Sequence, residues 1–265
     1  MNNVNKTLYI PLFGKALVSK KGIILEDKMA EKIWEAEGFE LKGKSKSKWL
    51  AYYMGVRSLV FDEWVKSEMA ERSDATVIHL GCGMDSRALR VGTQGHKWYD
   101  VDFPDVIAER KRYFNETEDY SMIGRDVRDG KWLDTVSKDG RAIVIMEGIS
   151  MYLTESEMQD ILAGLSAHFN ELSILMDSYT SLAAKMSKYK NPVNEVGVTE
   201  VYGIDDPALW QTDFFVFVGE HEMTPQKYIE ELSGMEKKIF QKLYAGSFSK
   251  KLYRLYEYQK ENRNS

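Results

Sequence analysis

Between residues 75 and 177 the sequence repeats one pattern: a short apolar run with many β-branched residues, a glycine or an acid at or just after its end, and then a helical segment. The runs occupy residues 75–80, 97–102, 120–124, 142–147 and 172–177. Strands that alternate with helices pair in parallel, and the helices cover both faces of the sheet. The pattern therefore predicts an α/β fold with a doubly wound, mostly parallel sheet.

The flanking regions extend this prediction. An apolar stripe at helical spacing from Trp49 to Trp64 predicts a long helix, and a shorter helix is expected near 27–37. Residues 214–218 and 252–258 predict two further strands with a helix at 225–232 between them. We expect 1–72 to be an N-terminal helical lid and 73–265 the main domain, with an irregular insertion at 179–212 that caps a pocket.

Composition excludes several classes of protein. The balance of 43% hydrophobic and 29% charged residues is that of a globular domain, and a net charge of −5 argues against nucleic acid as a partner. The single cysteine, Cys82, excludes an internal disulfide and a multi-cysteine zinc site, so no metal is expected. No apolar stretch approaches the roughly 20 residues that cross a bilayer, and the start lacks a signal peptide. These features predict a cytoplasmic protein with no membrane partner.

The ends of the first four predicted strands carry the candidate binding residues. In an open α/β sheet, ligands bind outside the carboxyl ends of the strands, where the strand order reverses. The first strand ends in Gly81-Cys82-Gly83, and Asp102, Asp126 and Glu147 follow at the ends of the next three. Four strand ends with suitable chemistry favour a cofactor site over four unrelated helix caps.

Two cofactor classes fit the glycine turn followed by an acid 21 residues later. In a dinucleotide dehydrogenase, a third glycine opens the pyrophosphate site, but Ser86 stands there and Asp85 would repel a phosphate. S-adenosylmethionine has no phosphate and fits better. Asp102 would accept hydrogen bonds from its ribose, and Asp126 with Val127 would contact its adenine. Glu147 would then bind its ammonium group. A nicotinamide oxidoreductase is the last alternative.

Several of these segments resemble the motifs of a known family. Residues 78–87 (IHLGCGMDSR) are similar to the Leu-Gly-x-Gly-x-Asp-x-Arg signature of the leucine carboxyl methyltransferase family, which includes bacterial O-methyltransferases of the tetracenomycin polyketide type. Residues 100–104 (DVDFP), 126–129 (DVRD) and 147–153 (EGISMYL) resemble its VDxP, DLRD and EGxxxYL segments. Residues 7–16 (TLYIPLFGKA) are similar to the opening of its bacterial branch. The resemblance covers about 6–180.

The resemblance implies a Rossmann-like methyltransferase sheet of seven strands, with the last strand antiparallel and N-terminal helices over the cofactor. It implies that Arg57 binds the cofactor's carboxylate, which suits a bidentate guanidinium. The alternative is a surface ion pair of Arg57 with Asp62 or Glu63. The implied cofactor site contains Arg57, Gly81, Gly83, Asp102, Asp126, Val127 and Glu147. A role for Lys15 in the cofactor or acceptor site is suggested by the same comparison.

The resulting hypothesis is an S-adenosylmethionine-dependent O-methyltransferase that acts on a small-molecule acceptor. A carboxylate acceptor is ionised at neutral pH and needs no general base, whereas a phenol would need one. The histidines offer no convincing base, so no catalytic residue is assigned. Arg87 and Arg90 would either clamp the acceptor or brace the glycine loop. The alternatives are a protein C-terminal carboxyl methyltransferase and a non-catalytic nucleoside-binding module of the same fold.

Overall fold

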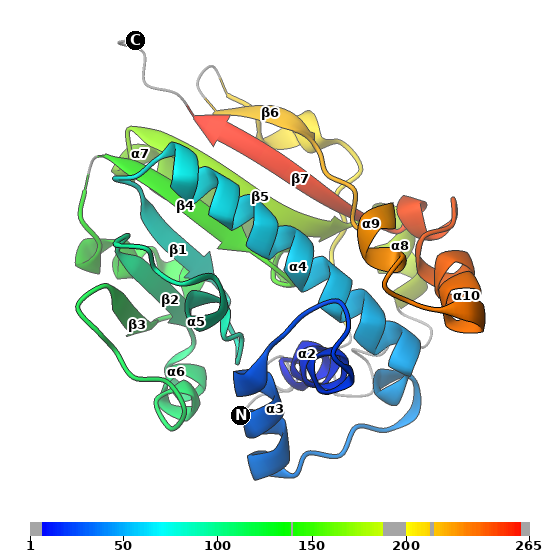
Figure 1. The fold of residues 1–265 in the computed structure, drawn as a ribbon. Coiled ribbons are helices and arrows are strands. Elements are labelled where there is room, and N and C mark those ends of the chain that lie inside the picture. Colours follow the sequence, from blue (N-terminus) through cyan, green and yellow to red (C-terminus); the bar gives the residue numbers. More distant parts are fainter. Residues whose placement is uncertain (1–6, 139, 188–199, 213–214, 261–265) are drawn as a thin grey trace.

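One seven-stranded sheet forms the centre of the molecule (Figure 1). The structure is a computed structural model and describes residues 7–138, 140–187, 200–212 and 215–260. The strands lie in the order β3-β2-β1-β4-β5-β7-β6, and β7 alone is antiparallel to its neighbours. Their bounds are β1 Thr76–Leu80, β2 Trp98–Asp102, β3 Tyr120–Gly124, β4 Arg141–Met146, β5 Glu171–Tyr179, β6 Phe215–Glu220 and β7 Tyr253–Lys260. The predicted Rossmann-like fold class is confirmed.

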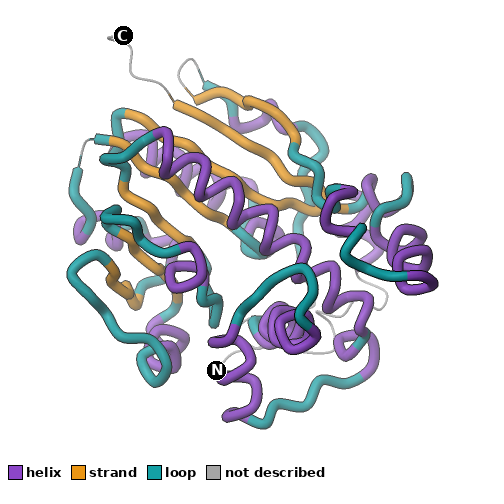
Figure 2. Tube along the Cα trace, viewed as in Figure 1, coloured by secondary structure: helices purple, strands orange, loops and turns teal. Residues whose placement is uncertain are grey.

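Helices cover both faces of the sheet, as Figure 2 shows. The α-helices are α2 Tyr9–Lys21, α3 Lys28–Glu37, α4 Lys48–Glu71, α5 Arg87–Val91, α6 Pro104–Arg110, α7 Glu155–His168, α8 Ser181–Ser187, α9 Gln226–Ile229 and α10 Gly234–Tyr244. Short 3-10 turns occupy η1 Gly43–Lys46, η2 Val127–Asp129, η3 Lys131–Thr135, η4 Ser150–Tyr152, η6 Pro207–Trp210 and η7 Ser249–Lys251. Local signals set the starts of two helices: Asp27 caps α3, and a capping box of Thr154 and Glu157 begins α7.

Two helical regions differ from the sequence-based expectation. β5 continues to Tyr179 and α8 follows it, so the beginning of the predicted irregular insertion is regular structure. Part of that insertion, 188–199, lies outside the described residues. The helix expected at 225–232 is the short α9, and α10 comes after it. Met235, Ile239 and Leu243 recur at helical spacing in α10, so the sequence contains a signal for this helix that the prediction did not use.

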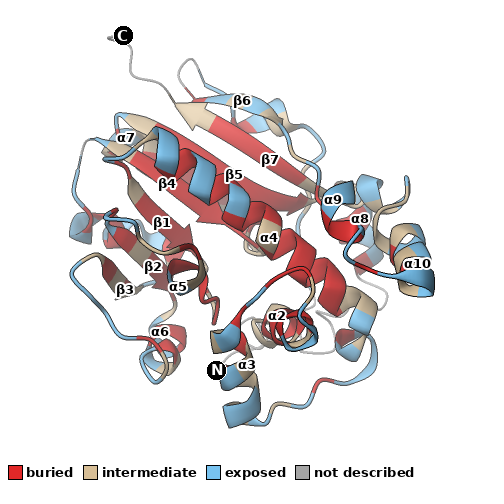
Figure 3. Ribbon diagram, in the orientation of Figure 1, coloured by how far each residue is buried: buried red, intermediate tan, exposed pale blue. Residues whose placement is uncertain are grey.

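Alternate residues of the central strands supply two cores, one on each face of the sheet. Figure 3 shows these strands buried along most of their length. In β4, Ile143 and Ile145 belong to the core that contains the apolar residues of α4. Val144 and Met146 belong to the opposite core, beneath α7. Burial on both faces explains why the strand sequence is continuously apolar rather than alternating.

Helix α2 crosses α4 at close range. A Cβ atom on Gly14 would lie 2.6 Å from the Cβ of Met54, so this crossing requires a residue without a side chain. The contact places α2 beside the carboxyl ends of the strands, where it covers the cavity described below. The division into a lid at 1–72 and a domain at 73–265 stays a prediction, because α4 also packs against the sheet.

Candidate functional site

A cavity of about 570 Å³ lies at the carboxyl ends of the parallel strands. This volume is in the range of small-molecule and cofactor sites. The predicted residues Arg57, Gly81, Gly83, Asp102, Asp126, Val127 and Glu147 all line it. Residues up to 90 positions apart in sequence (147 − 57) therefore meet at one site. It lies at the switch point between the neighbouring strands β1 and β4, where the strand order reverses.

The loop after β1 brings bare backbone to the cavity wall. Gly81 has φ +66°, and a Cβ atom there would lie 2.7 Å from the Cδ1 atom of Ile149. The loop is held from below by Arg110 of α6, whose Nη1 atom donates to the carbonyl oxygens of Gly83 (2.8 Å) and Asp85 (2.9 Å). The sequence did not identify Arg110 as part of the site, because a basic residue near the end of a predicted helix is common.

Asp102, at the end of β2, turns its carboxylate to the same loop. Its Oδ2 atom accepts the Gly83 N–H and its Oδ1 atom accepts the Phe103 N–H, both at 2.7 Å. Burial raises the pKa of Asp102 to about 6, and the two backbone donors only partly oppose that shift. Each carboxylate oxygen retains acceptor capacity for a hydroxyl donor. This arrangement suits the ribose contact predicted for Asp102.

The residues after β3 lie at the same cavity and differ from each other in charge and burial. Val127 is buried, as an apolar contact requires. Asp126 forms a 2.5 Å ion pair with Arg128 and also accepts the backbone N–H of Arg128. The hydrogen bond from the Arg128 side chain lowers the pKa of Asp126. The adenine contact of Asp126 stays a prediction, and the structure adds Arg128 as its partner.

Glu147 and Arg57 form the charged centre of the site. Arg57 Nε lies 2.9 Å from Glu147 Oε1, and Ser58 Oγ donates to the same oxygen at 3.0 Å. Arg87 binds the other oxygen of Glu147. Burial would raise the pKa of Glu147, but the Arg87 and Arg57 guanidiniums outweigh that effect and hold it at about 2. Glu147 is therefore ionised throughout the neutral range.

Asp177, two residues before the end of β5, completes the environment of Arg57. Its Oδ2 atom lies 3.1 Å from Arg57 Nη1 and accepts the Tyr253 hydroxyl at 2.5 Å, while its Oδ1 atom accepts the Gly148 N–H at 2.7 Å. The alternative in which Arg57 pairs on the surface with Asp62 or Glu63 is wrong. Arg57 is buried, and α4 turns it toward the strand ends rather than along its own surface.

Arg87 and Arg90 brace the loop and do not line the cavity. Arg87 is fully buried and joins Glu147 to Asp62, whose Oδ1 atom lies 2.7 Å from its Nε atom. Arg90 binds Asp62 at 2.6 Å and Asp27 at 2.7 Å, and so connects α4 with the start of α3. The bracing interpretation is therefore the correct one, because both guanidiniums are engaged beneath the site.

Three further residues of the cavity, Lys15, His79 and Cys82, have surroundings that limit what each can do. Lys15 of α2 forms a buried 3.1 Å ion pair with Asp85, which ties the covering helix to the glycine loop. His79 lies inside β1, where burial first and then the Arg87 charge lower its pKa to about 4. Burial raises the pKa of the Cys82 thiol. Neither His79 nor Cys82 is therefore suited to act as a base or a nucleophile at neutral pH.

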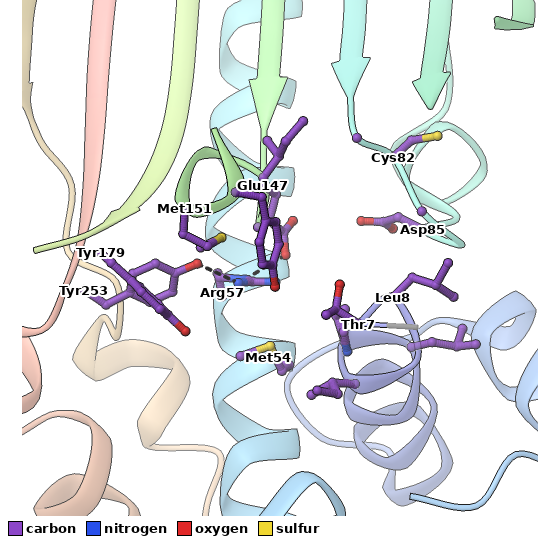
Figure 4. Close-up of a pocket in the computed structure, with 18 of the residues that line it drawn as sticks. Thr7, Leu8, Met54, Arg57, Cys82, Asp85, Glu147, Met151, Tyr179 and Tyr253 are labelled. Atoms are coloured by element: carbon purple, nitrogen blue, oxygen red, sulfur yellow. Dashed lines mark hydrogen bonds and ion pairs between the residues drawn. The ribbon is translucent and has the colours of Figure 1, made fainter. Parts of the chain in front are cut away.

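A second part of the cavity is built from tyrosines that the sequence did not reveal as a group. Tyr53, Tyr179, Tyr244 and Tyr253 line it and come from α4, β5, α10 and β7. Figure 4 shows Tyr179 and Tyr253 on one side of Arg57, with Cys82 on the other. No sequence motif joins these tyrosines, because they are brought together only by the pairing of β5 with β7 and by the placement of α10.

Two classes of site are absent from the part of the chain that the structure describes. No group of three or more His, Cys, Asp or Glu side chains is arranged to hold a metal ion. No helix in that part combines the length and hydropathy needed to span a bilayer.

Comparison with known proteins gives matches of sequence and of fold. The family model described as leucine carboxyl methyltransferase matches residues 3–166. The tetracenomycin polyketide synthesis O-methyltransferase TcmP of Streptomyces glaucescens is 31% identical over 209 residues, which cover 78% of this chain and 77% of that protein. The S-adenosyl-L-methionine-dependent methyltransferase dpfgK of Gibberella zeae is 28% identical over 236 residues, covering 80% and 79%.

A solved structure shows the same fold at low sequence identity. Magnesium protoporphyrin IX methyltransferase ChlM of Synechocystis, solved with SAH bound, superposes with a TM-score of 0.51 at 10% identity. The match covers 87% of this chain and 93% of ChlM. It supports the methyltransferase type of sheet and says nothing of the acceptor.

Proposed function

This chain belongs to the leucine carboxyl methyltransferase family, and we propose that it methylates a carboxylate oxygen of a small molecule. It is an S-adenosylmethionine-dependent O-methyltransferase. The observation that carries the proposal is the convergence of Gly81, Asp102, Val127 and Glu147, from four strand ends, on one cavity.

The residues of the cavity fit the cofactor in shape and charge. Gly81 and Gly83 leave room at the loop, where a side chain on Gly81 would meet Ile149 at 2.7 Å. Asp102 is nearly buried with spare acceptor capacity, so the ribose hydroxyls satisfy it. An apolar contact at Val127 and an acceptor at Asp126 suit adenine. The ionised Glu147 suits an ammonium group.

Arg57 holds the carboxylate of the cofactor in this proposal. Its Nε and Nη1 atoms are bound to Glu147 and Asp177, and its Nη2 atom takes no part in those bonds. A Cβ atom on Gly148 would lie 3.4 Å from that Nη2 atom, so the bare glycine keeps the space before it open. Lys15 pairs with Asp85, so that the negative charge of Asp85 does not repel the carboxylate of the cofactor.

The protein's contribution to the reaction is alignment and exclusion of water. S-adenosylmethionine, when bound, supplies a methyl group already activated on a positively charged sulfur. Placing an acceptor oxygen in line with that methyl group contributes up to about 7–11 kcal/mol for ideal alignment. The α2 helix and the tyrosines of the cavity provide the enclosure that this requires.

A carboxylate acceptor is favoured over a phenol because the cavity carboxylates are assigned to the cofactor, and neither His79 nor the buried tyrosines Tyr53 and Tyr253 are suited to remove a proton. His79 faces Arg87, with 3.5 Å between its Nε2 atom and Nη1, and its pKa is lowered to about 4. Burial raises the pKa values of Tyr53 and Tyr253, so their hydroxyls stay protonated at neutral pH. An ionised acceptor needs no proton removed.

Calorimetry with S-adenosylhomocysteine tests the cofactor site. Asp102→Ala removes up to two charged hydrogen bonds, each worth about 1.5–3 kcal/mol, and should weaken binding by at least about tenfold. Asp105→Ala is the matched control, since Asp105 is an exposed acid three residues on that does not line the cavity. Equal affinities of the two variants would contradict the assignment.

The acceptor class is tested with labelled cofactor in a cell lysate. Label recovered as base-labile esters of small organic acids supports the proposal. Label in protein C-termini would indicate the alternative of a protein carboxyl methyltransferase. Cofactor binding without transfer to any acceptor would instead indicate a non-catalytic nucleoside-binding module.

A further inference from the structure

Four tyrosine rings form a continuous wall at the end of the cavity away from the glycine loop. Tyr53 and Tyr244 stack with 4.9 Å between centroids and 25° between planes. Tyr253 lies 6.3 Å from Tyr53 and meets Tyr179 edge to face at 4.9 Å. We call these four residues the tyrosine cluster. Rings held by one another in this way present fixed aromatic surfaces rather than flexible side chains.

The tyrosine cluster carries no net charge. Burial raises the pKa values of Tyr53, Tyr244 and Tyr253, so these three remain neutral. Among the described residues that line the cavity, the cations are each paired: Lys15 with Asp85, Arg57 with Glu147 and Asp177, and Arg128 with Asp126. A charged group placed among the rings would therefore lose its hydration without gaining a counter-ion.

Tyr253 connects the tyrosine cluster to the charged centre. Its hydroxyl accepts from Arg57 Nη1 at 3.0 Å and donates to Asp177, while its ring belongs to the cluster. A molecule lying against the cluster thus has one end beside the groups that we assign to the cofactor's amino-acid part. That is the end at which its reacting oxygen must lie.

The outer rim of this half of the cavity is apolar. Met186 of α8 and Leu243 of α10 both line the cavity, yet remain 47% and 50% exposed. Large apolar side chains that are half exposed at a cavity rim provide contact for an apolar ligand that passes between them.

Resting on the proposed methyl transfer to a carboxylate, we propose that the acceptor is an aromatic carboxylic acid. Its flat, uncharged ring system lies against the tyrosine cluster, its carboxylate points toward the cofactor, and its far edge lies between Met186 and Leu243. A ring pair of this kind adds about 0.5–1.5 kcal/mol beyond simple burial. A peptide tail fits less well, because its buried N–H and C=O groups would each need a partner.

Binding of small probes to the protein saturated with S-adenosylhomocysteine tests this proposal by calorimetry. The probes are 2-naphthoic acid and undecanoic acid, which have the same number of carbon atoms but differ in planarity. We expect naphthoate to bind more tightly, by about 3- to 10-fold. Undecanoate binding as tightly as naphthoate would overturn the proposal.

Variants of the tyrosine cluster separate ring contact from general destabilisation. Tyr244→Ala should weaken naphthoate by about 3- to 10-fold and change undecanoate little, whereas Tyr244→Phe should retain naphthoate binding. Tyr202→Ala is the control, because Tyr202 is 40% exposed and does not line the cavity. An equal loss for both probes in Tyr244→Ala would count against stacking and overturn the proposal.

The rim is tested by two substitutions on one helix. Leu243→Glu places a charge at the cavity rim and should weaken naphthoate, whereas Met235→Glu alters a residue of α10 that is 69% exposed and does not line the cavity. Identical affinities in these two variants would overturn the placement of the ring. S-adenosylhomocysteine binding is measured in every variant. Its absence from the wild-type protein would refute the proposed function, whereas its presence without a preference for naphthoate refutes only the acceptor class.

Discussion

The two halves of the cavity are built by different means. The half proposed for the cofactor is assembled from short motifs at consecutive strand ends, and charged side chains hold it together. The tyrosine cluster is assembled from α4, β5, α10 and β7, which are far apart in sequence, and it is held by ring contacts. Charged networks tolerate few changes because every member needs its partner. In an apolar wall, by contrast, a single substitution can change the shape of the pocket, and with it the ligand that fits, without leaving a charge unpaired. One half is thus suited to a constant ligand and the other to a variable one.

The largest effect is expected from breaking the charged half at its base. Arg87→Ala would leave the carboxylates of Glu147 and Asp62 buried without this partner, which costs about 3–5 kcal/mol. Urea unfolding measures the change in the free energy of unfolding. The control is Arg128→Ala, whose ion pairs lie at the surface and contribute about 0–1 kcal/mol. Similar losses in the free energy of unfolding for both variants would contradict the contrast between the buried ion pairs of Arg87 and the solvated ion pairs of Arg128.

A smaller effect is expected from filling the glycine loop. Gly81→Ala combines a left-handed backbone with a 2.7 Å contact to Ile149, and should cost about 1–3 kcal/mol. It should also weaken S-adenosylhomocysteine binding in calorimetry. Gly92→Ala has a similar φ of +79° with no atom near the added Cβ, so it isolates backbone strain from crowding. If Gly92→Ala weakened the cofactor as much as Gly81→Ala, strain alone would explain the result.

The pH dependence of cofactor binding should follow Asp102. Burial raises the pKa of Asp102 to about 6, above its value in an unfolded chain, so its ionised form is disfavoured in the folded protein. Without ligand, the folded protein therefore loses stability as the pH rises toward 6 and Asp102 ionises, and it regains that stability as the pH falls. Ribose hydroxyls bind the ionised form. The affinity for S-adenosylhomocysteine should therefore fall below pH 6, by at most about tenfold per pH unit.

Calorimetric titrations between pH 5 and 8 measure this dependence. Asp102→Asn should bind more weakly at pH 8 and show a flat profile below pH 6. A wild-type slope that persists in Asp102→Asn would assign the dependence to another group. The Arg87 and Arg57 guanidiniums hold the pKa of Glu147 at about 2, outside this range.

The smallest effect should come from the residue that belongs to both halves. Tyr253→Phe removes the hydroxyl that bridges Arg57 and Asp177 but keeps the ring of the tyrosine cluster. The loss of about 0.5–1.5 kcal/mol should weaken S-adenosylhomocysteine by about 2- to 12-fold. Binding of 2-naphthoic acid to the protein saturated with S-adenosylhomocysteine should be unchanged. The opposite result, with naphthoate binding weakened and cofactor binding unaffected, would show that the Tyr253 hydroxyl belongs to the acceptor half of the cavity and not to the cofactor half.

Strand ends were predictable because each depends on neighbours in the chain. The apolar run before Gly81 and the acid that ends the run at Asp102 are local signals, and parallel pairing brings such ends to one edge of a sheet. Pro104 begins α6 for a local reason too, since its fixed φ and missing N–H suit the first helical position. Residues whose roles depend on distant partners were not predictable. Asp177 ends a predicted strand, and nothing in its neighbourhood indicates the ion pair with Arg57.

The sequence by itself determined the doubly wound sheet, a candidate site at its carboxyl edge, and the family. It could do so because periodicity, turn glycines and strand-end acids are signals carried by residues close together in the chain. Only the tertiary structure decided which charges are paired. Arg57 forms an ion pair with Glu147 and not with Asp62, whereas Arg87 binds both Asp62 and Glu147. It alone also brought Tyr244 of α10 beside Tyr53 of α4, across 191 positions (244 − 53). The reason is physical: a buried charge selects its partner by distance in space, and aromatic rings gather wherever packing places them.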